Sequence, residues 1–122
     1  MENRKLGPVE TRFAEMIWAN APISSGELVR LSLQELEWKK STTYTVLKKL
    51  CEQGLFCNEG GVVSVVISRE EFFALQCERF VEENFAGSLP AFLAAFTTRK
   101  APSPREVDEI RRMIACYGGK RP

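Results

Sequence analysis

The sequence predicts a mainly α-helical protein with one small β-hairpin. Three observations carry this prediction: two Ser-x-x-Glu helix starts, a segment over 39–53 with separate apolar and polar faces, and a run of β-branched residues soon after it. Three helices followed by a hairpin is the element order of a winged helix-turn-helix. We therefore expect an N-terminal winged helix over 1–67 and a C-terminal helical module over 68–122.

The first three helices have recognisable ends. Pro8, at a first helical position, opens the first helix, and Asn20-Ala21-Pro22 ends it. Ser24 and Glu27 form a capping box at the start of the second, in which side chain and backbone satisfy each other's unpaired donors. The third helix spans 39–53 and ends before Gly54, which adopts the left-handed conformation of a helix terminus easily.

The hairpin and the C-terminal helices follow from similar signals. A turn-forming cluster at 58–61 separates 55–57 from the β-branched run at 62–67. A second capping box, Ser68 with Glu71, opens a long helix that reaches Phe85. Helices over 88–96 and 103–117 complete the prediction, and Gly118-Gly119 is expected to end the last one.

Composition argues against an enzyme and against a membrane protein. The 122 residues include no His, which removes the commonest general base. No phosphate-binding loop, nucleophile elbow or metal-ligand spacing occurs, so we expect no catalysis, no metal and no cofactor. No apolar run is long enough to span a bilayer and no signal peptide is recognisable, which predicts a cytoplasmic protein without membrane insertion.

The cysteines are spread along the chain without a Cys-x-x-Cys pair. In a cytosolic protein such residues are usually small hydrophobic side chains of the core, and this is our interpretation of Cys51, Cys57, Cys77 and Cys116. A thiol redox sensor formed by Cys51 and Cys57 stays open as an alternative.

The polar face of the helix over 39–53 carries the candidate DNA-binding residues. Hydroxyl groups and a phenol suit phosphate oxygens and base edges, and lysines reach the phosphate backbone as point charges. A solvated helix face is the alternative, since the net charge of +1 is low for a DNA-binding domain. The candidate residues are Lys39, Lys40, Ser41, Thr42, Tyr44, Thr45, Lys48 and Lys49.

The C-terminal module carries more apolar residues than one helix face needs. We expect it to pair with a second chain, which would present two recognition helices to a two-fold symmetric DNA site. Packing of these residues onto the winged helix is the alternative. The candidate dimerisation residues are Phe72, Phe73, Leu75, Phe80, Val81, Phe85, Leu89, Phe92, Leu93, Phe96, Ile110 and Ile114.

The chain resembles the penicillinase-repressor family of bacterial transcriptional repressors over nearly its whole length. The resemblance lies in the segments 6–18, 38–55, 68–72 and 85–89. It implies a homodimer that binds a palindromic operator in double-stranded DNA and blocks transcription. By position, it also implies that Thr42, Tyr44 and Thr45 approach bases, and that Ser41 and Lys49 approach phosphates.

The resemblance also makes a membrane sensor-protease system a candidate partner, because such a system releases the antibiotic-resistance members of the family. Their cleaved bond joins Asn to Phe, whereas this chain has Ala95-Phe96 at that place. The copper-responsive members carry paired Cys-x-Cys motifs, which the lone Cys116 does not supply. An alternative function is a winged helix that has lost DNA binding and uses its apolar C-terminal half to bind a protein, in keeping with the near-zero net charge and the acidic wing.

Overall fold

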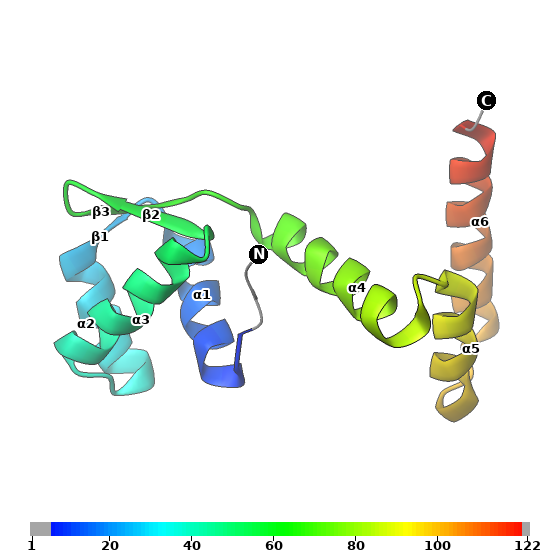
Figure 1. The fold of residues 1–122 in the computed structure, drawn as a ribbon, viewed down its shortest axis with the longest axis horizontal. Coiled ribbons are helices and arrows are strands. Elements are labelled where there is room, and N and C mark those ends of the chain that lie inside the picture. The colour runs from blue at the N-terminus through cyan, green and yellow to red at the C-terminus, as the bar shows by residue number, and fades with distance from the viewer. Residues whose placement is uncertain (1–5, 121–122) are drawn as a thin grey trace. The chain divides into compact units, whose positions relative to one another are not determined.

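A computed structural model describes residues 6–120 of the chain, with side chains described for 6–117. These residues form helices and a small antiparallel sheet, which confirms the predicted mainly α fold with a β wing (Figure 1). The elements are α1 (Pro8–Asn20), β1 (Ile23–Ser24), α2 (Ser25–Leu36), α3 (Lys40–Glu52), β2 (Phe56–Glu59), β3 (Val62–Val65), α4 (Arg69–Phe85), α5 (Leu89–Arg99) and α6 (Pro104–Lys120).

Backbone contacts divide the chain into two compact units, Met1–Arg79 and Phe80–Pro122. The division falls inside α4, whereas the sequence prediction put it at 67/68, before that helix. The reason is that the first turns of α4 pack on the first unit: Phe72 is 2% exposed there.

The sheet of the first unit has the strand order β1-β3-β2, and both pairings are antiparallel. Phe56 lies opposite Val65 and Glu59 opposite Val62 in the predicted hairpin. Its turn uses Gly60 and Gly61 at φ of 59° and 78°, a conformation that glycine adopts without strain. β1 was not predicted, because two residues are too few to give an alternating pattern.

The core of the first unit lies between α1, α2, α3 and the sheet. Phe13 and Ile17 of α1 and Leu28 of α2 are completely buried, as is Leu50 of α3. Each comes from the apolar side of an amphipathic helix, so the helical periodicity of the sequence determines which side chains meet. The core also holds Val63 of β3, Phe56 at the start of β2, and Leu55, the residue before that strand.

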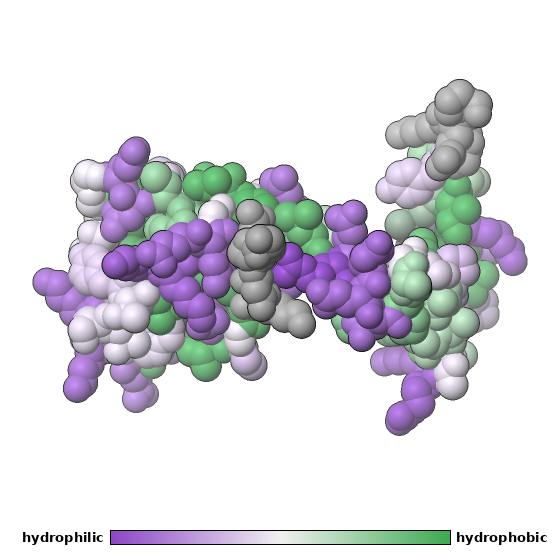
Figure 2. All heavy atoms as spheres, in the orientation of Figure 1, coloured by the Kyte–Doolittle hydropathy of each residue, from purple (hydrophilic) through white to green (hydrophobic). Residues whose placement is uncertain are grey.

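The second unit has no fully buried side chain among its described residues. Rings of Phe80, Phe85 and Phe92 lie 5.8–6.1 Å apart between centroids, but half of the Phe80 surface stays exposed. Figure 2 shows hydrophobic side chains gathered over α5 and α6. The backbone of α6 continues to Lys120, so the prediction that Gly118-Gly119 ends this helix was wrong.

The backbone of the first unit is strained at Glu37. Glu37, at the C-terminal end of α2, has a φ of 59° and a ψ of 34°, a left-handed conformation that disfavours side chains with a Cβ. We expect Glu37→Gly to raise the free energy of unfolding by about 0.5–1 kcal/mol in urea denaturation.

The matched control is Glu35→Gly, which places the same residue inside α2 and should lower the free energy of unfolding by up to about 1 kcal/mol. If Glu37→Gly were less stable than wild type, the left-handed backbone at this position would not be a source of strain.

Candidate nucleic-acid interface

The turn between α2 and α3 sets the direction of α3. After the left-handed Glu37, Trp38 packs its ring 5.0 Å from that of Phe13, and its backbone N–H donates to the carbonyl of Ser32 at 3.3 Å. A large ring anchored on the core holds the short connection in place. α3 therefore starts at a fixed angle to α2, as the helix-turn-helix arrangement requires.

Burial separates α3 into the two faces that the sequence predicts. Leu47 and Leu50, together with Thr43, are buried in the core. The opposite face is exposed and consists of Lys40, Ser41, Thr42, Thr45, Lys48, Lys49 and Glu52. Lys39, which precedes the helix, is exposed as well. The structure thus places six of the eight candidate DNA-binding residues on the exposed surface of α3 and Lys39 directly before it, while Tyr44 is half-buried.

The N-terminus of α3 lacks the caps found on other helices of the chain. Ser24, Ser88 and Ser103 accept hydrogen bonds from backbone N–H groups at the starts of α2, α5 and α6. The N-cap of α3 is Lys39, with no side-chain hydrogen bond, and the first turn of α3 holds no acid. Unpaired N–H groups and the positive end of the helix dipole are therefore left for an external anion.

Tyr44 differs from the other candidates because its ring is half-buried. Its hydroxyl forms a hydrogen bond with the Oγ of Ser25 at 3.1 Å. Ser25 is the first residue of α2, so this bond ties the middle of α3 to the start of its neighbour. The contact fits a residue that positions α3, and Ser25 had no local signal in the sequence.

Lys49 forms an ion pair with the first helix. Its Nζ lies 2.7 Å from Oε2 of Glu10 in α1, and Oε1 of the same carboxylate accepts the backbone N–H of Gly7 at 3.2 Å. The hydrogen bond from Lys49 lowers the pKa of Glu10, against the opposing effect of partial burial. No pattern within one helix predicts this ion pair, because the two residues lie 39 positions apart in the sequence.

The wing offers no cation to DNA. The turn residues from Asn58 to Gly61 are exposed, and Glu59 adds a negative charge. Val62 and Val66 are also exposed, by 46% and 61%. The described part of the hairpin therefore presents an apolar and slightly acidic surface.

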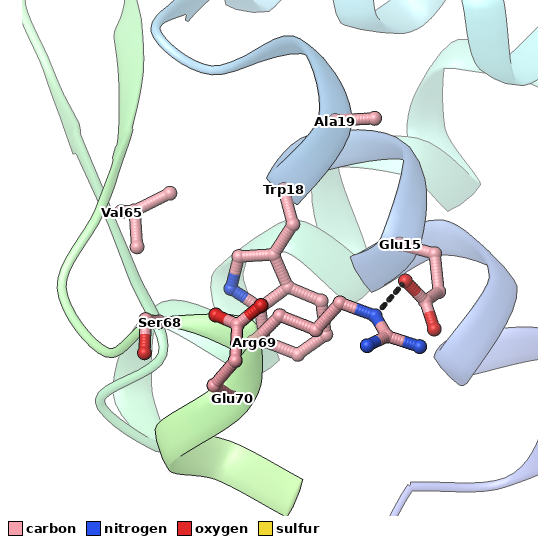
Figure 3. A pocket seen from close by; sticks show the side chains of 7 residues that line it. All are labelled: Glu15, Trp18, Ala19, Val65, Ser68, Arg69 and Glu70. Carbon is pink, nitrogen blue, oxygen red and sulfur yellow. Dashed lines mark hydrogen bonds and ion pairs between the residues drawn. The ribbon is translucent and has the colours of Figure 1, made fainter.

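The start of α4 is joined to α1 around Trp18, as Figure 3 shows. Arg69 donates from Nε to Oε1 of Glu15 at 2.7 Å, and its guanidinium lies 4.9 Å from the ring centroid of Phe73. An open depression of about 340 Å³ adjoins this ion pair. Its lining residues are Glu15, Trp18, Ala19, Val65, Ser68, Arg69 and Glu70.

The candidate dimerisation residues fall into two groups. Phe72 is buried and Phe73 half-buried beside Trp18, at ring distances of 5.5 and 6.2 Å, so these two follow the alternative of packing onto the winged helix. The other candidates keep exposed surface. Exposed are Leu75, Phe80, Leu89, Phe96, Ile110 and Ile114; half-buried are Val81, Phe85, Phe92 and Leu93.

The cysteines are free thiols in two settings. Cys77 and Cys116 are exposed, whereas Cys51 at the end of α3 and Cys57 in β2 are half-buried. Burial raises the pKa of the Cys51 thiol, and the neighbouring Cys57 raises it further. A higher pKa reduces the thiolate that thiol oxidation requires, which weakens the redox alternative for this pair.

Three helices, a helix-turn-helix with an exposed polar second helix, and a hairpin directly after it define a winged helix-turn-helix protein. The family model described as penicillinase repressor matches residues 6–116. The chain therefore belongs to the penicillinase repressor family, a family of transcriptional regulators. No curated protein matches the sequence significantly. None of the helices in the described range 6–120 has the length and apolar character needed to cross a membrane.

The pair between Glu10 and Lys49 predicts a pH-dependent contribution to stability. Because the folded-state pKa of Glu10 lies below its usual 4.5, the stabilising effect is present above pH 4.5 and is lost as the pH falls through the lower value. We expect Glu10→Gln to lower the free energy of unfolding by less than about 1 kcal/mol near neutral pH, since the pair is partly exposed.

Urea denaturation of wild type and Glu10→Gln over a range of acidic pH measures this contribution. The two stabilities should converge below the folded-state pKa of Glu10. An equal loss at every pH would mean that the charge of Glu10 does not contribute.

Proposed function

We propose that the protein is a dimeric transcriptional repressor that binds a palindromic operator through α3 and blocks transcription. The observation that carries this proposal is the surface of α3. Its exposed hydroxyls and lysines lie on one face of a helix that has an uncapped N-terminus and directly follows a helix-turn-helix turn. Membership of a repressor family supports the same function.

The residues of α3 divide by what each side chain can reach. Thr42 and Thr45 carry a methyl and a hydroxyl on the exposed face, which suits thymine methyls and base edges in the major groove. Lys40 and Ser41, beside the uncapped N-terminus, suit a phosphate. Lys48 supplies a charge further along the helix. These assignments retain the predicted roles of Ser41, Thr42 and Thr45.

Tyr44 and Lys49 take narrower roles in this proposal. The hydroxyl of Tyr44 is engaged by Ser25, so we assign Tyr44 to holding α3 in place and leave base contact to the threonines. Lys49 can meet a phosphate only in exchange for, or alongside, the carboxylate of Glu10.

The low charge of the first unit favours binding of two copies of the chain to one DNA. Residues 6–79 contain eight Lys or Arg against ten Glu, so one unit is weakly acidic overall. The wing adds no cation. Since interactions with phosphates supply much of the affinity for DNA, a single copy would bind weakly, and two copies on one DNA would double the number of phosphates that are neutralised.

The second unit supplies the surface that pairing needs. Val107, Ile110, Ile114 and Tyr117 recur at spacings of three and four residues along α6, the spacing of a helix that packs along another helix. Ile114 and Tyr117 are 57% and 65% exposed in the single chain. A second copy that covers this surface would remove it from water, which is favourable.

DNA binding is tested by selecting fragments of the host genome with the purified protein and measuring affinity by fluorescence anisotropy. We expect the bound fragments to share a palindrome. Thr45→Ala should reduce discrimination at one base position of each half-site by about 1–3 kcal/mol. Lys48→Ala should weaken binding to all sequences and make the salt dependence shallower, by about 0.9 for each phosphate that is no longer neutralised.

The matched control for the lysine is Lys100→Ala, which removes the same side chain from the end of α5 and should leave operator binding unchanged. Unaltered binding by both α3 variants would show that another surface meets the DNA.

Dimerisation is tested with a charge placed on α6. Burying an unpaired carboxylate is unfavourable, so Ile114→Glu should convert the dimer into a monomer and weaken operator binding at least tenfold. Arg112→Glu places the same residue two positions earlier, away from the apolar stripe, and should keep the dimer. Sedimentation velocity measures both. A dimeric Ile114→Glu variant would contradict the role of this stripe.

A protein-binding module is the second candidate function, favoured by the exposed valines and the acidic residue of the wing. In that case the genomic selection would retain no fragment above background, even at low salt where interactions with phosphates are strongest.

A further inference from the structure

The carboxylate of Glu10 engages two groups that also suit a DNA phosphate. Its Oε2 accepts from the Nζ of Lys49 at 2.7 Å, and its Oε1 accepts from the backbone N–H of Gly7 at 3.2 Å. A lysine ammonium and an N–H group at a helix N-terminus are both frequent donors to phosphate oxygens. One internal anion therefore occupies a donor at the N-cap of α1 and a donor on α3.

The ion pair is accessible enough for exchange. The side chain of Lys49 is 49% exposed and that of Glu10 is 25% exposed, so both partners of the pair keep contact with solvent. Water can solvate each partner if the pair separates, and the net stabilisation from such an exposed pair is small. Exchange of Glu10 for an external phosphate therefore needs little energy.

The position of the pair makes this exchange relevant to the proposed interface. Lys49 lies one residue after Lys48 on α3, in the exposed region assigned to DNA. Neutralising one lysine there has a large effect on the attraction of this surface for phosphates, because residues 6–79 carry more acids than bases. A carboxylate beside a bound phosphate also repels it.

We propose that Glu10 competes with DNA phosphates for Lys49 and thereby limits the affinity of the protein for DNA of any sequence. The inference rests on the proposed DNA-binding function and adds a residue of α1 to the determinants of affinity. The effect is electrostatic, so it acts on operator and unrelated DNA alike and leaves base contacts by Thr42 and Thr45 unchanged.

The test is the affinity of Glu10→Gln for an operator fragment and for an unrelated duplex, measured over a range of salt concentrations. Glutamine keeps an oxygen that can accept the N–H of Gly7 and removes only the charge. We expect both duplexes to bind roughly three- to tenfold more tightly per protomer, the effect of one nearby charge at a protein surface. The salt dependence should steepen by up to about 0.9 for each further phosphate that the protein neutralises.

Glu15→Gln is the matched control. It removes the same charge from the same helix and breaks an ion pair of the same 2.7 Å length, but the partner is Arg69 of α4. This control should change the affinity and the salt dependence much less. Glu10→Ser, which also removes the charge, replaces Glu10→Gln if the latter does not fold, as judged by circular dichroism.

A double variant identifies Lys49 as the residue through which Glu10 acts. In a Lys49→Gln background, Glu10→Gln should raise the affinity only slightly, because no lysine is left to release. An equal increase in affinity with and without Lys49 would overturn the proposed competition, as would an affinity of Glu10→Gln equal to or below that of wild type. If neither wild type nor Glu10→Gln binds any duplex at low salt, the proposed function itself fails, and the inference fails with it.

Discussion

The packing of Trp18 is the interaction on which the rest of the first unit depends. Its indole N–H donates to the carbonyl of Ile67 at 3.0 Å, between the end of β3 and the start of α4. Its ring lies 5.4 Å from Phe56 of β2 and 5.5 Å from Phe72 of α4. One side chain of α1 thus holds both the sheet and the next helix, with its single polar group satisfied. The sheet covers the core in which α3 buries Leu47. The contacts of Trp18 in α1 therefore help to fix the position of α3 and the direction of its exposed face.

Charge placement matters more than total charge in this protein. Among the described residues of the first unit, Arg30 pairs with Glu27 of its own helix, and Arg69 of α4 pairs with Glu15 of α1. The lysines lie instead on α3 or directly before it. Among these, Lys49 is the one with an acidic partner within the described part of the chain. A weakly acidic unit can therefore still present a positive surface, because a nearby charge acts more strongly than the average over the molecule.

Local signals in the sequence predicted most of the helices, and distant contacts account for what they missed. Each capping box specifies its helix start within four residues, so Ser24 and Ser68 were sufficient to place α2 and α4. Periodicity likewise predicted which side of α3 is buried. The pair of Glu10 with Lys49 and the bond of Tyr44 with Ser25 join separate helices, and no pattern within one helix can encode them. The sequence left open whether Phe72 packs on the winged helix or on a second chain, because apolar residues around a whole helix do not reveal which partner covers each side.

The position of an apolar residue along α4 decides which partner covers it. The aromatic residues of its first turns, Phe72 and Phe73, complete the core of the winged helix. Those of its last turns, Phe80 and Phe85, belong to the second unit and contact Phe92 of α5. A single helix therefore contributes apolar residues to two separate clusters, of which only the first is closed within one chain. The second cluster has no fully buried member among the described residues, so it leaves apolar surface exposed to water, and covering such surface is favourable. The core of the first unit is thus closed within one copy, whereas the second cluster leaves apolar surface exposed in the single chain, and this difference is the physical reason to propose a dimer for a chain whose winged-helix unit is weakly charged.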